Sequence, residues 1–183
     1  AARCASVPVV VHTYHGCVAE LSPKTVMGRL LTICERFAAR VSDALVAVSA
    51  MEVRQKKAAG IGHGKQYHVI HAGIDLGRFQ GKQNLRRPPS VEGEPVIGTI
   101  GTLTYEKGLD SLIEVLPAVL IHHPRLKLCI VGTGPMADAL REQAKRIGVD
   151  HAVHFAGVAE DVRPWLSALD LLVQPSRSEG LAL

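Results

Sequence analysis

The sequence predicts an α/β fold made of two doubly wound parallel sheets joined by a linker. Short apolar runs of strand length recur along the chain and carry almost no charge, which is typical of strands buried on both faces of a parallel sheet. Longer segments with apolar residues at helical spacing separate these runs. Strand and helix therefore alternate, as they do in doubly wound folds. One stretch, residues 80–94, has neither pattern and divides the series in two.

The composition is that of a globular protein, with 47% hydrophobic and 21% charged residues in a chain of 183. The net charge of +4 is small and its Lys and Arg residues are scattered, so nucleic-acid binding is not expected. No apolar run reaches the length of a membrane span. The cysteines lack Cys-x-x-Cys spacing, which favours reduced thiols in a cytoplasmic protein. A basic group is a candidate for peripheral contact with anionic phospholipid at the inner face of a membrane. Its members are Arg29, Arg36, Arg40, Arg54, Lys56 and Lys57.

The first domain is predicted to span residues 1–79. Strands are expected at 7–13, 44–48 and 67–71, where apolar residues run together. Between the first two lies a segment from Thr25 to Val41 with a helical apolar face. That face comprises Met27, Leu30, Leu31, Cys34, Phe37, Ala38 and Val41. Ser49 and Glu52 form a capping box that begins a second helix, which extends to about Ala59.

Residues 80–94 collect Gly, Lys, Arg, Asn and paired prolines, and are predicted to be the linker. The second domain is predicted to span residues 95–183, where strands and helices again alternate. The expected strands are 95–100, 126–131, 152–155 and 170–174, and the expected helices follow Gly108, Gly134 and Asp161. This half of the chain repeats the doubly wound pattern of the first.

Two loops in the second domain follow apolar strands and carry residues suited to an anionic ligand. The loop from Gly101 to Gly108 contains Lys107, a charge that can neutralise a diphosphate. The stretch Pro175–Leu181 contains Glu179, which can accept hydrogen bonds from sugar hydroxyls, and Gly180, where a helix N-terminus is expected. The carboxyl ends of parallel strands meet at one crevice, so both loops are expected there. The alternative is a pair of ordinary strand-to-helix turns with solvated charges.

A glycine motif supports a competing hypothesis. Gly132-Thr-Gly-Pro-Met-Ala137 fits the dinucleotide fingerprint, which would make the protein an oxidoreductase. The fingerprint also needs a carboxylate at the end of the next strand, and that strand ends at Gly157 without one. The alternative is that the glycines serve only a tight turn, with Pro135 in the first helical turn.

Two histidines near the end of an expected strand are candidates for chemistry. His12 and His15 flank the end of a strand, where an imidazole can donate a hydrogen bond, act as a base, or bond only to backbone. His63, His68 and His71 lack the spacing of metal ligands, so no metal site is expected among them.

Taken together, the motifs resemble the retaining glycosyltransferases of family 4, which have the GT-B fold. The resemblance runs in the expected order through nearly the whole chain, which makes it specific although each motif alone is weak. The matching segments are Thr13–Gly16, Asp43–Ser49, Val69–Phe79, Gly101–Gly108, Val131–Pro135, Asp161–Trp165 and Pro175–Leu181. It implies two Rossmann-like domains, both incomplete in this chain. The chain is therefore expected to be an internal part of a longer enzyme, and inactive alone.

The resemblance also implies roles for particular residues. The catalytic residues would be His15 and Glu179. The donor diphosphate would be bound by Lys107, Gly101, Thr102, Gly180 and Leu181. The nucleotide base would lie near Gly132, Gly134, Gly157 and Val158. Two positions depart from the family pattern, since Thr102 stands where an Arg is usual and Ala72 where an Asn is usual.

The expected activity is transfer of a hexose-type sugar from a nucleotide-diphosphate sugar to an acceptor hydroxyl, with retention at the anomeric carbon. The acceptor is expected to be a saccharide, a lipid or a small molecule. No cofactor or metal ion is expected, because the nucleotide sugar is itself the donor substrate. Three alternatives remain open: a phosphorylase or epimerase of the same fold, a dinucleotide-dependent oxidoreductase, and a non-catalytic nucleotide-sugar binding module.

Overall fold

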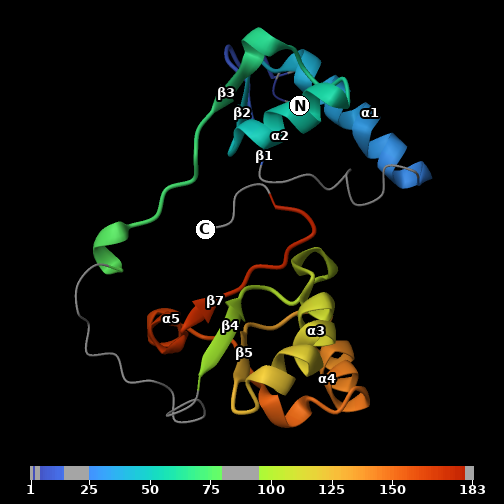
Figure 1. The fold of residues 1–183 in the computed structure, drawn as a ribbon. Helices are drawn as coiled ribbons and strands as arrows, with labels where there is room; N and C mark the ends of the chain where they lie inside the picture. The colour runs from blue at the N-terminus through green and yellow to red at the C-terminus, as the bar shows by residue number, and fades with distance from the viewer. Residues whose placement is uncertain (1, 3–4, 15–24, 80–94, 180–183) are drawn as a thin grey trace. The chain divides into compact units, whose positions relative to one another are not determined.

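The computed structural model describes residue 2 and residues 5–14, 25–79 and 95–179. The chain divides into two compact units, one formed by Ala1–Ile74 with Ser178–Leu183 and the other by Asp75–Arg177. Each unit contains its own parallel sheet (Figure 1). The predicted linker, residues 80–94, lies outside the described residues.

The first unit has a sheet with the strand order β1-β2-β3. Its elements in chain order are β1 (Val11–Tyr14), α1 (Val26–Val41), β2 (Ala44–Ala47), α2 (Ala50–Ala58), the short 3₁₀ turn η2 (Gly64–Gln66) and β3 (Tyr67–Val69). Both strand pairs are parallel, and Leu45 of β2 lies opposite His12 on one side and Tyr67 on the other. Leu45 is fully buried, together with Ala39 of α1 and Ile61.

The capping box of α2 forms, with one residue of displacement. The Ser49 hydroxyl accepts the Glu52 N–H at 3.1 Å, as the pattern predicts. The Glu52 carboxylate accepts the N–H of Val48, at 3.0 Å, where the motif would use that of Ser49. The end of β2 is thereby fastened to the first turn of α2.

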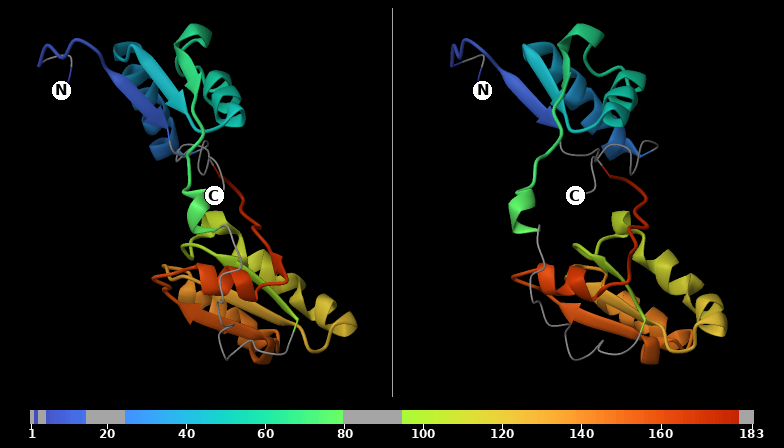
Figure 2. Two further views of the ribbon diagram at one scale, coloured as in Figure 1. Left: turned by 90° about the vertical axis from the view of Figure 1, so that its left-hand side faces the viewer. Right: turned by 60° about the vertical axis from the view of Figure 1, so that its left-hand side comes forward.

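The second unit has a parallel sheet with the order β6-β5-β4-β7. The first element of this unit in chain order is the 3₁₀ turn η3 (Leu76–Arg78). The remaining elements are β4 (Val96–Ile100), η5 (Tyr105–Lys107), α3 (Leu109–His122), β5 (Lys127–Val131), α4 (Ala137–Arg146), η6 (Asp150–Ala152), β6 (Val153–Gly157), α5 (Arg163–Ala168) and β7 (Leu171–Leu172). Both views in Figure 2 show the helices of this unit flanking its sheet.

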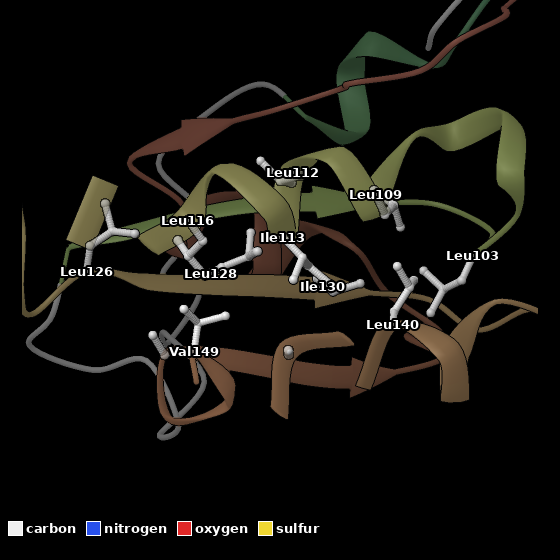
Figure 3. Close-up of a cluster of buried hydrophobic side chains, with 12 residues drawn as sticks. Leu103, Leu109, Leu112, Ile113, Leu116, Leu126, Leu128, Ile130, Leu140 and Val149 are labelled. Atoms are coloured by element: carbon white, nitrogen blue, oxygen red, sulfur yellow. The ribbon is translucent and has the colours of Figure 1, made fainter. Parts of the chain in front are cut away.

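Both faces of this second sheet are buried, because alternate residues of β5 enter different cores. Leu128 and Ile130 pack with α3 and α4 in the larger core, which Figure 3 shows. Cys129 and Val131 pack on the opposite face with Ala168 of α5. The doubly wound α/β fold predicted from the apolar strands is therefore confirmed.

Several predicted elements differ from those observed. β1 begins at Val11 and not at Val7, so the exposed Val7 and Val9 lie outside the strand. Helix α1 buries Gly28 and Ala39, whereas the predicted apolar face is largely open: Met27, Leu30 and Phe37 are more than half exposed. The described sheet has only three short strands, so it covers a narrow stripe of a 16-residue helix. Within the described residues, no helix is long and apolar enough to cross a membrane.

Candidate functional site

A small cavity lies at the carboxyl ends of β4, β5 and β6. It has a volume of about 280 Å³ and a mostly apolar lining. The lining residues are Ile100, Gly101, Thr102, Val131, Gly132, Thr133, Val158, Ala159 and Val162. Four of them, Gly101, Thr102, Gly132 and Val158, are residues that the sequence placed in the donor site. The structure therefore brings together loops that are up to 57 residues apart in sequence, since Gly101 and Val158 share the cavity.

The glycines of the Gly132-Thr-Gly134 motif allow two loops to pack backbone against backbone. A side chain on Gly132 would collide with the carbonyl of Gly101, and one on Gly134 would collide with the backbone of Leu103. Hydrogen bonds join the same loops: the Leu103 N–H donates to the Thr133 carbonyl at 3.0 Å, and the Leu103 carbonyl accepts the Met136 N–H at 2.9 Å. Gly134 itself does not line the cavity but supports its wall.

This packing accounts for the glycine motif without a dinucleotide. In a dinucleotide site the N–H groups at the start of the helix would face the pyrophosphate. Here the Met136 N–H, just before α4, is already bonded to Leu103. The end of β6 offers Gly157, with a left-handed φ of 73°, and the exposed Val158 in place of a carboxylate. The nearby Asp161 is bound to Arg163 through both of its carboxylate oxygens.

Lys107 lies next to this cavity. It ends the turn η5, and Gly108 follows with a left-handed φ of 65° as the N-cap of α3. The Lys107 Cε atom lies 3.9 Å from the point where a Cβ on Gly101 would stand, so the lysine stem passes over the cavity wall. Hydrogen bonds from the Glu106 backbone and the Thr104 side chain hold the pKa of Glu106 below its usual range, with Lys107 contributing. The turn thus presents one cation beside a cavity of mostly apolar character.

A second loop packs against the Lys107 turn. A side chain on Gly108 would collide with the Pro175 carbonyl, so Pro175 and Gly108 touch through their backbones. The Arg177 N–H donates to the Glu106 carbonyl at 2.7 Å. The Arg177 guanidinium forms a two-pronged ion pair with Asp110 and holds the pKa of that carboxyl below its usual range. The two predicted loops are therefore adjacent, as expected from their position after β4 and β7.

The first unit presents Tyr14 at the end of β1. Its ring is buried, and the ammonium of Lys56 lies 4.3 Å from the ring centroid. Lys56 also donates to both carboxylate oxygens of Glu35, at 3.0 Å each. The next residue, His15, lies outside the described residues.

The remaining predicted site residues lie at the end of the chain. Glu179 is exposed and is grouped with the first unit. Gly180 and Leu181 lie outside the described residues.

Two interpretations of charged and thiol residues need correction. Lys56 is fully buried in its ion pair, so it does not belong to a basic surface, and Arg36 donates twice to the Ala59 carbonyl. Cys34 is exposed, contrary to its expected place in the core. Cys129 is buried, and burial raises its pKa to about 11. In the part of the chain that the structure describes, no three His, Cys, Asp or Glu side chains gather as a metal site requires.

Comparison with known families assigns both halves of the chain. Residues 1–78 match the model for glycosyltransferase family 4, and residues 94–183 match the model for glycosyl transferases group 1. The chain belongs to the GT-B glycosyltransferases related to family 4. The resemblance that the motifs indicated is thereby confirmed.

The curated relatives that the chain matches are longer proteins, and each match covers only part of their length. An uncharacterised glycosyltransferase of Methanocaldococcus jannaschii is 35% identical over 124 residues, which cover 63% of this chain and 32% of that protein. A GDP-mannose-dependent alpha-(1-6)-phosphatidylinositol monomannoside mannosyltransferase of Mycobacterium tuberculosis is 28% identical over 162 residues. That match covers 84% of this chain and 42% of the mycobacterial protein. The chain thus spans less than half the length of these relatives.

Solved structures show the same fold. HepE of Anabaena in complex with UDP and glucose aligns with a TM-score of 0.75 at 21% identity, over 96% of this chain and 48% of that one. The glycosyltransferase WaaG aligns with a TM-score of 0.67 at 22% identity, over 96% of this chain and 55% of that one. These likenesses show that the chain has the GT-B fold.

Sequence reasoning overlooked the residues that join the Lys107 loop to the segment after β7. Arg177 was noted as part of the Pro175–Leu181 motif without a role, and Asp110 and Tyr105 were not singled out. Asp110 is in the first turn of α3, where an acidic residue is common for its interaction with the helix dipole. Its partner is 67 residues away, so no local pattern could reveal the pair.

Proposed function

We propose that the protein transfers a hexose from a nucleoside-diphosphate sugar to an acceptor hydroxyl with retention at the anomeric carbon. The observation that carries this proposal is the placement of Lys107 beside the cavity at the carboxyl ends of β4, β5 and β6. Ligands of open α/β sheets bind at this end of the strands. The relatives support the donor class, since one is named as GDP-mannose-dependent and HepE was solved with UDP and glucose.

Each part of the donor has a matching group. The apolar cavity suits a nucleobase, and Lys107 beside it suits the diphosphate as a point charge. Glu179 would accept hydrogen bonds from the sugar, and His15 would lie at the reacting centre. As the sugar leaves, negative charge develops on the diphosphate, and a cation already in place stabilises that charge most. This chemistry is carried by side chains of the protein and the donor itself, without a cofactor.

The test uses the full-length protein with a panel of UDP-, GDP- and ADP-sugars and saccharide or lipid acceptors. We expect one donor to be turned over, and the anomeric configuration of the product, read by NMR, to match that of the donor. Glu179→Gln should reduce transfer while leaving the affinity for the free nucleoside diphosphate nearly unchanged. Glu142→Gln, on the exposed face of α4, is the matched control.

The outcomes separate the alternatives. Donor binding without turnover would identify a binding module, and glycosyl transfer to free phosphate would identify a phosphorylase. Saturable binding of a nicotinamide dinucleotide, read by fluorescence, would favour the oxidoreductase. A product of inverted configuration would contradict the proposed retention but not the proposed sugar transfer.

A peripheral membrane contact is proposed for helix α1. Val26, Leu30, Ile33 and Phe37 lie along one face and are all more than half exposed, and the neighbouring Arg29 and Arg40 are exposed as well. An apolar face beside cations suits an anionic lipid surface and would place the enzyme near a lipid acceptor. Co-sedimentation with phosphatidylglycerol vesicles, but not with phosphatidylcholine vesicles, is expected. Phe37→Gln should weaken it, and equal sedimentation with both lipids would argue against the contact.

A further inference from the structure

We propose that Arg177 is a positioning residue of the donor site, which fastens the turn that carries Lys107 to the segment that leads to Glu179. The inference rests on the proposed function and adds to it a residue that does not itself touch the donor. Arg177 follows β7, whereas Lys107 follows β4, and these two strands are neighbours in the sheet.

The side chain of Arg177 contacts both the Lys107 turn and the first turn of α3. Its Nη1 and Nη2 atoms donate to the two carboxylate oxygens of Asp110, at 2.8 and 2.7 Å. Nη1 also donates to the Tyr105 carbonyl at 2.7 Å, and the guanidinium lies 4.3 Å from the centroid of the Tyr105 ring. The turn is thus held by a hydrogen bond to the Tyr105 carbonyl and a cation–π contact with the Tyr105 ring, and the ion pair fastens Arg177 to the first turn of α3.

The backbone adds to this fastening. The Arg177 N–H donates to the carbonyl of Glu106, the residue directly before Lys107, at 2.7 Å. Gly108, directly after Lys107, touches the Pro175 carbonyl. Both neighbours of Lys107 are therefore fixed by the segment 175–177, and the direction in which the lysine leaves the turn depends on that segment.

The ion pair between Arg177 and Asp110 is partly exposed to solvent. The two side chains are 29% and 32% exposed, and such pairs generally contribute little to stability. The geometry here gives orientation instead, because the planar guanidinium can satisfy a carboxylate, a carbonyl and an aromatic face together. A lysine has no such fork and could replace the charge alone.

Arg177 would act through Lys107, since its Nη1 and Nη2 groups already donate to the Tyr105 carbonyl and to Asp110 and Ser111 at the start of α3. A displacement of a binding group by about 1 Å can reduce the rate on the order of 100-fold, so a loose turn would cost activity without unfolding the protein. The residues that line the cavity, Thr102 among them, are uncharged, so the position of the Lys107 ammonium matters for any anionic ligand there.

The test compares Arg177→Ala, Arg177→Lys and Asp110→Asn in the full-length protein. Arg141→Ala is a matched control, because Arg141 also pairs with a carboxylate, Asp138, and lies over an aromatic ring, that of Phe155. We expect Arg177→Ala and Asp110→Asn each to lower kcat/KM for the donor about 10- to 100-fold. The double variant should be hardly worse than either single one, because the two residues act as a unit. Arg177→Lys should recover only part of the loss.

Hydrogen exchange provides a measurement independent of turnover. In Arg177→Ala the amides of residues 105–108 should exchange at least about tenfold faster, while those of α4 keep their protection. Unchanged exchange in that turn would overturn the proposal, and so would equal losses in Arg141→Ala and Arg177→Ala. If the wild-type protein transfers no sugar, the proposed function fails, and the exchange data alone then decide whether Arg177 holds the turn.

Discussion

The ammonium of Lys56 lies 4.3 Å from the ring centroid of Tyr14, and the same ammonium donates to both carboxylate oxygens of Glu35. These contacts join the end of β1, helix α1 and helix α2. Lys56 is fully buried, whereas the side chain of Glu35 is 24% exposed. The buried cation therefore holds Tyr14, the last residue of β1, against both helices.

The first prediction concerns this buried cation. Lys56→Met should lower the free energy of unfolding by about 3 kcal/mol, because it removes one partner of a buried pair and leaves the Glu35 charge behind. Lys57→Met is the control, since Lys57 is exposed and lies 5.8 Å from the Tyr67 ring centroid, and should cost less than about 1 kcal/mol. Urea denaturation measures both. Restoration of stability in Lys56→Met/Glu35→Gln would support the account, and similar losses in the two lysine variants would refute it.

The second prediction concerns Lys107. Lys107→Ala should weaken the binding of a nucleoside diphosphate by about 1.5–3 kcal/mol, the range for a hydrogen bond to a charged group. Lys127→Ala is the matched control, because Lys127 begins β5 at the opposite end of the same sheet and donates to the His151 carbonyl. Calorimetry with UDP and GDP measures both variants. An affinity unchanged by Lys107→Ala would remove this lysine from the donor site.

The elements that sequence reasoning predicted correctly are those with a strong local pattern. In β5, apolar residues run without interruption from Leu128 to Val131, and the structure places Leu128 and Cys129 in the cores on opposite faces. The convergence of the Gly101 and Gly132 loops was also predictable, because parallel strands place their carboxyl ends at one edge.

What sequence reasoning could not supply depends on contacts distant in the chain. The motif at Gly132 fits the dinucleotide fingerprint only in part, and the sequence does not show that Gly132 makes room for the backbone of Gly101. The apolar residues of α1 recur at helical spacing, which predicts the helix. This spacing does not show which side of the helix a short sheet will cover. The Arg177–Asp110 pair joins two loops through side chains, and no periodicity describes such a pair.

The third prediction concerns pH. Hydrogen bonds from the Arg163 side chain, with its backbone N–H contributing, lower the pKa of Asp161 from 3.8 to about 2. Because the pKa of this carboxyl is lower in the folded protein than in the unfolded chain, its ionised form stabilises the fold at pH values above about 4. This stabilisation is lost as the pH falls from about 4 to 2. Asp161→Asn should therefore lower the Tm equally at pH 5 and pH 8. Its difference from wild type should shrink below pH 4.

Asp138→Asn is the control for this prediction, because its carboxylate is 96% exposed in the pair with Arg141. It should change the Tm little at any pH. NMR titration of the Asp161 carboxyl gives the pKa directly, and a value near 4 would show that Arg163 does not hold it.

The last prediction concerns the 183-residue chain in solution. The apolar row on α1 is open, with Val26 at 86% and Phe37 at 66% exposure. Strand β1 also lies at the edge of the described sheet, where Val11 is 55% exposed. An exposed apolar patch together with an open strand edge favours association between copies.

We therefore expect the isolated chain to form oligomers at micromolar concentration, as measured by light scattering. Phe37→Gln should reduce the association, because it replaces the aromatic residue of the apolar row with a polar one. Val115→Gln is the matched control, since Val115 is a 54% exposed apolar residue of α3 that lies outside this row. A monodisperse monomer would show that the exposed face of α1 is tolerated in water. Equal effects of the two substitutions would show that association does not depend on this face.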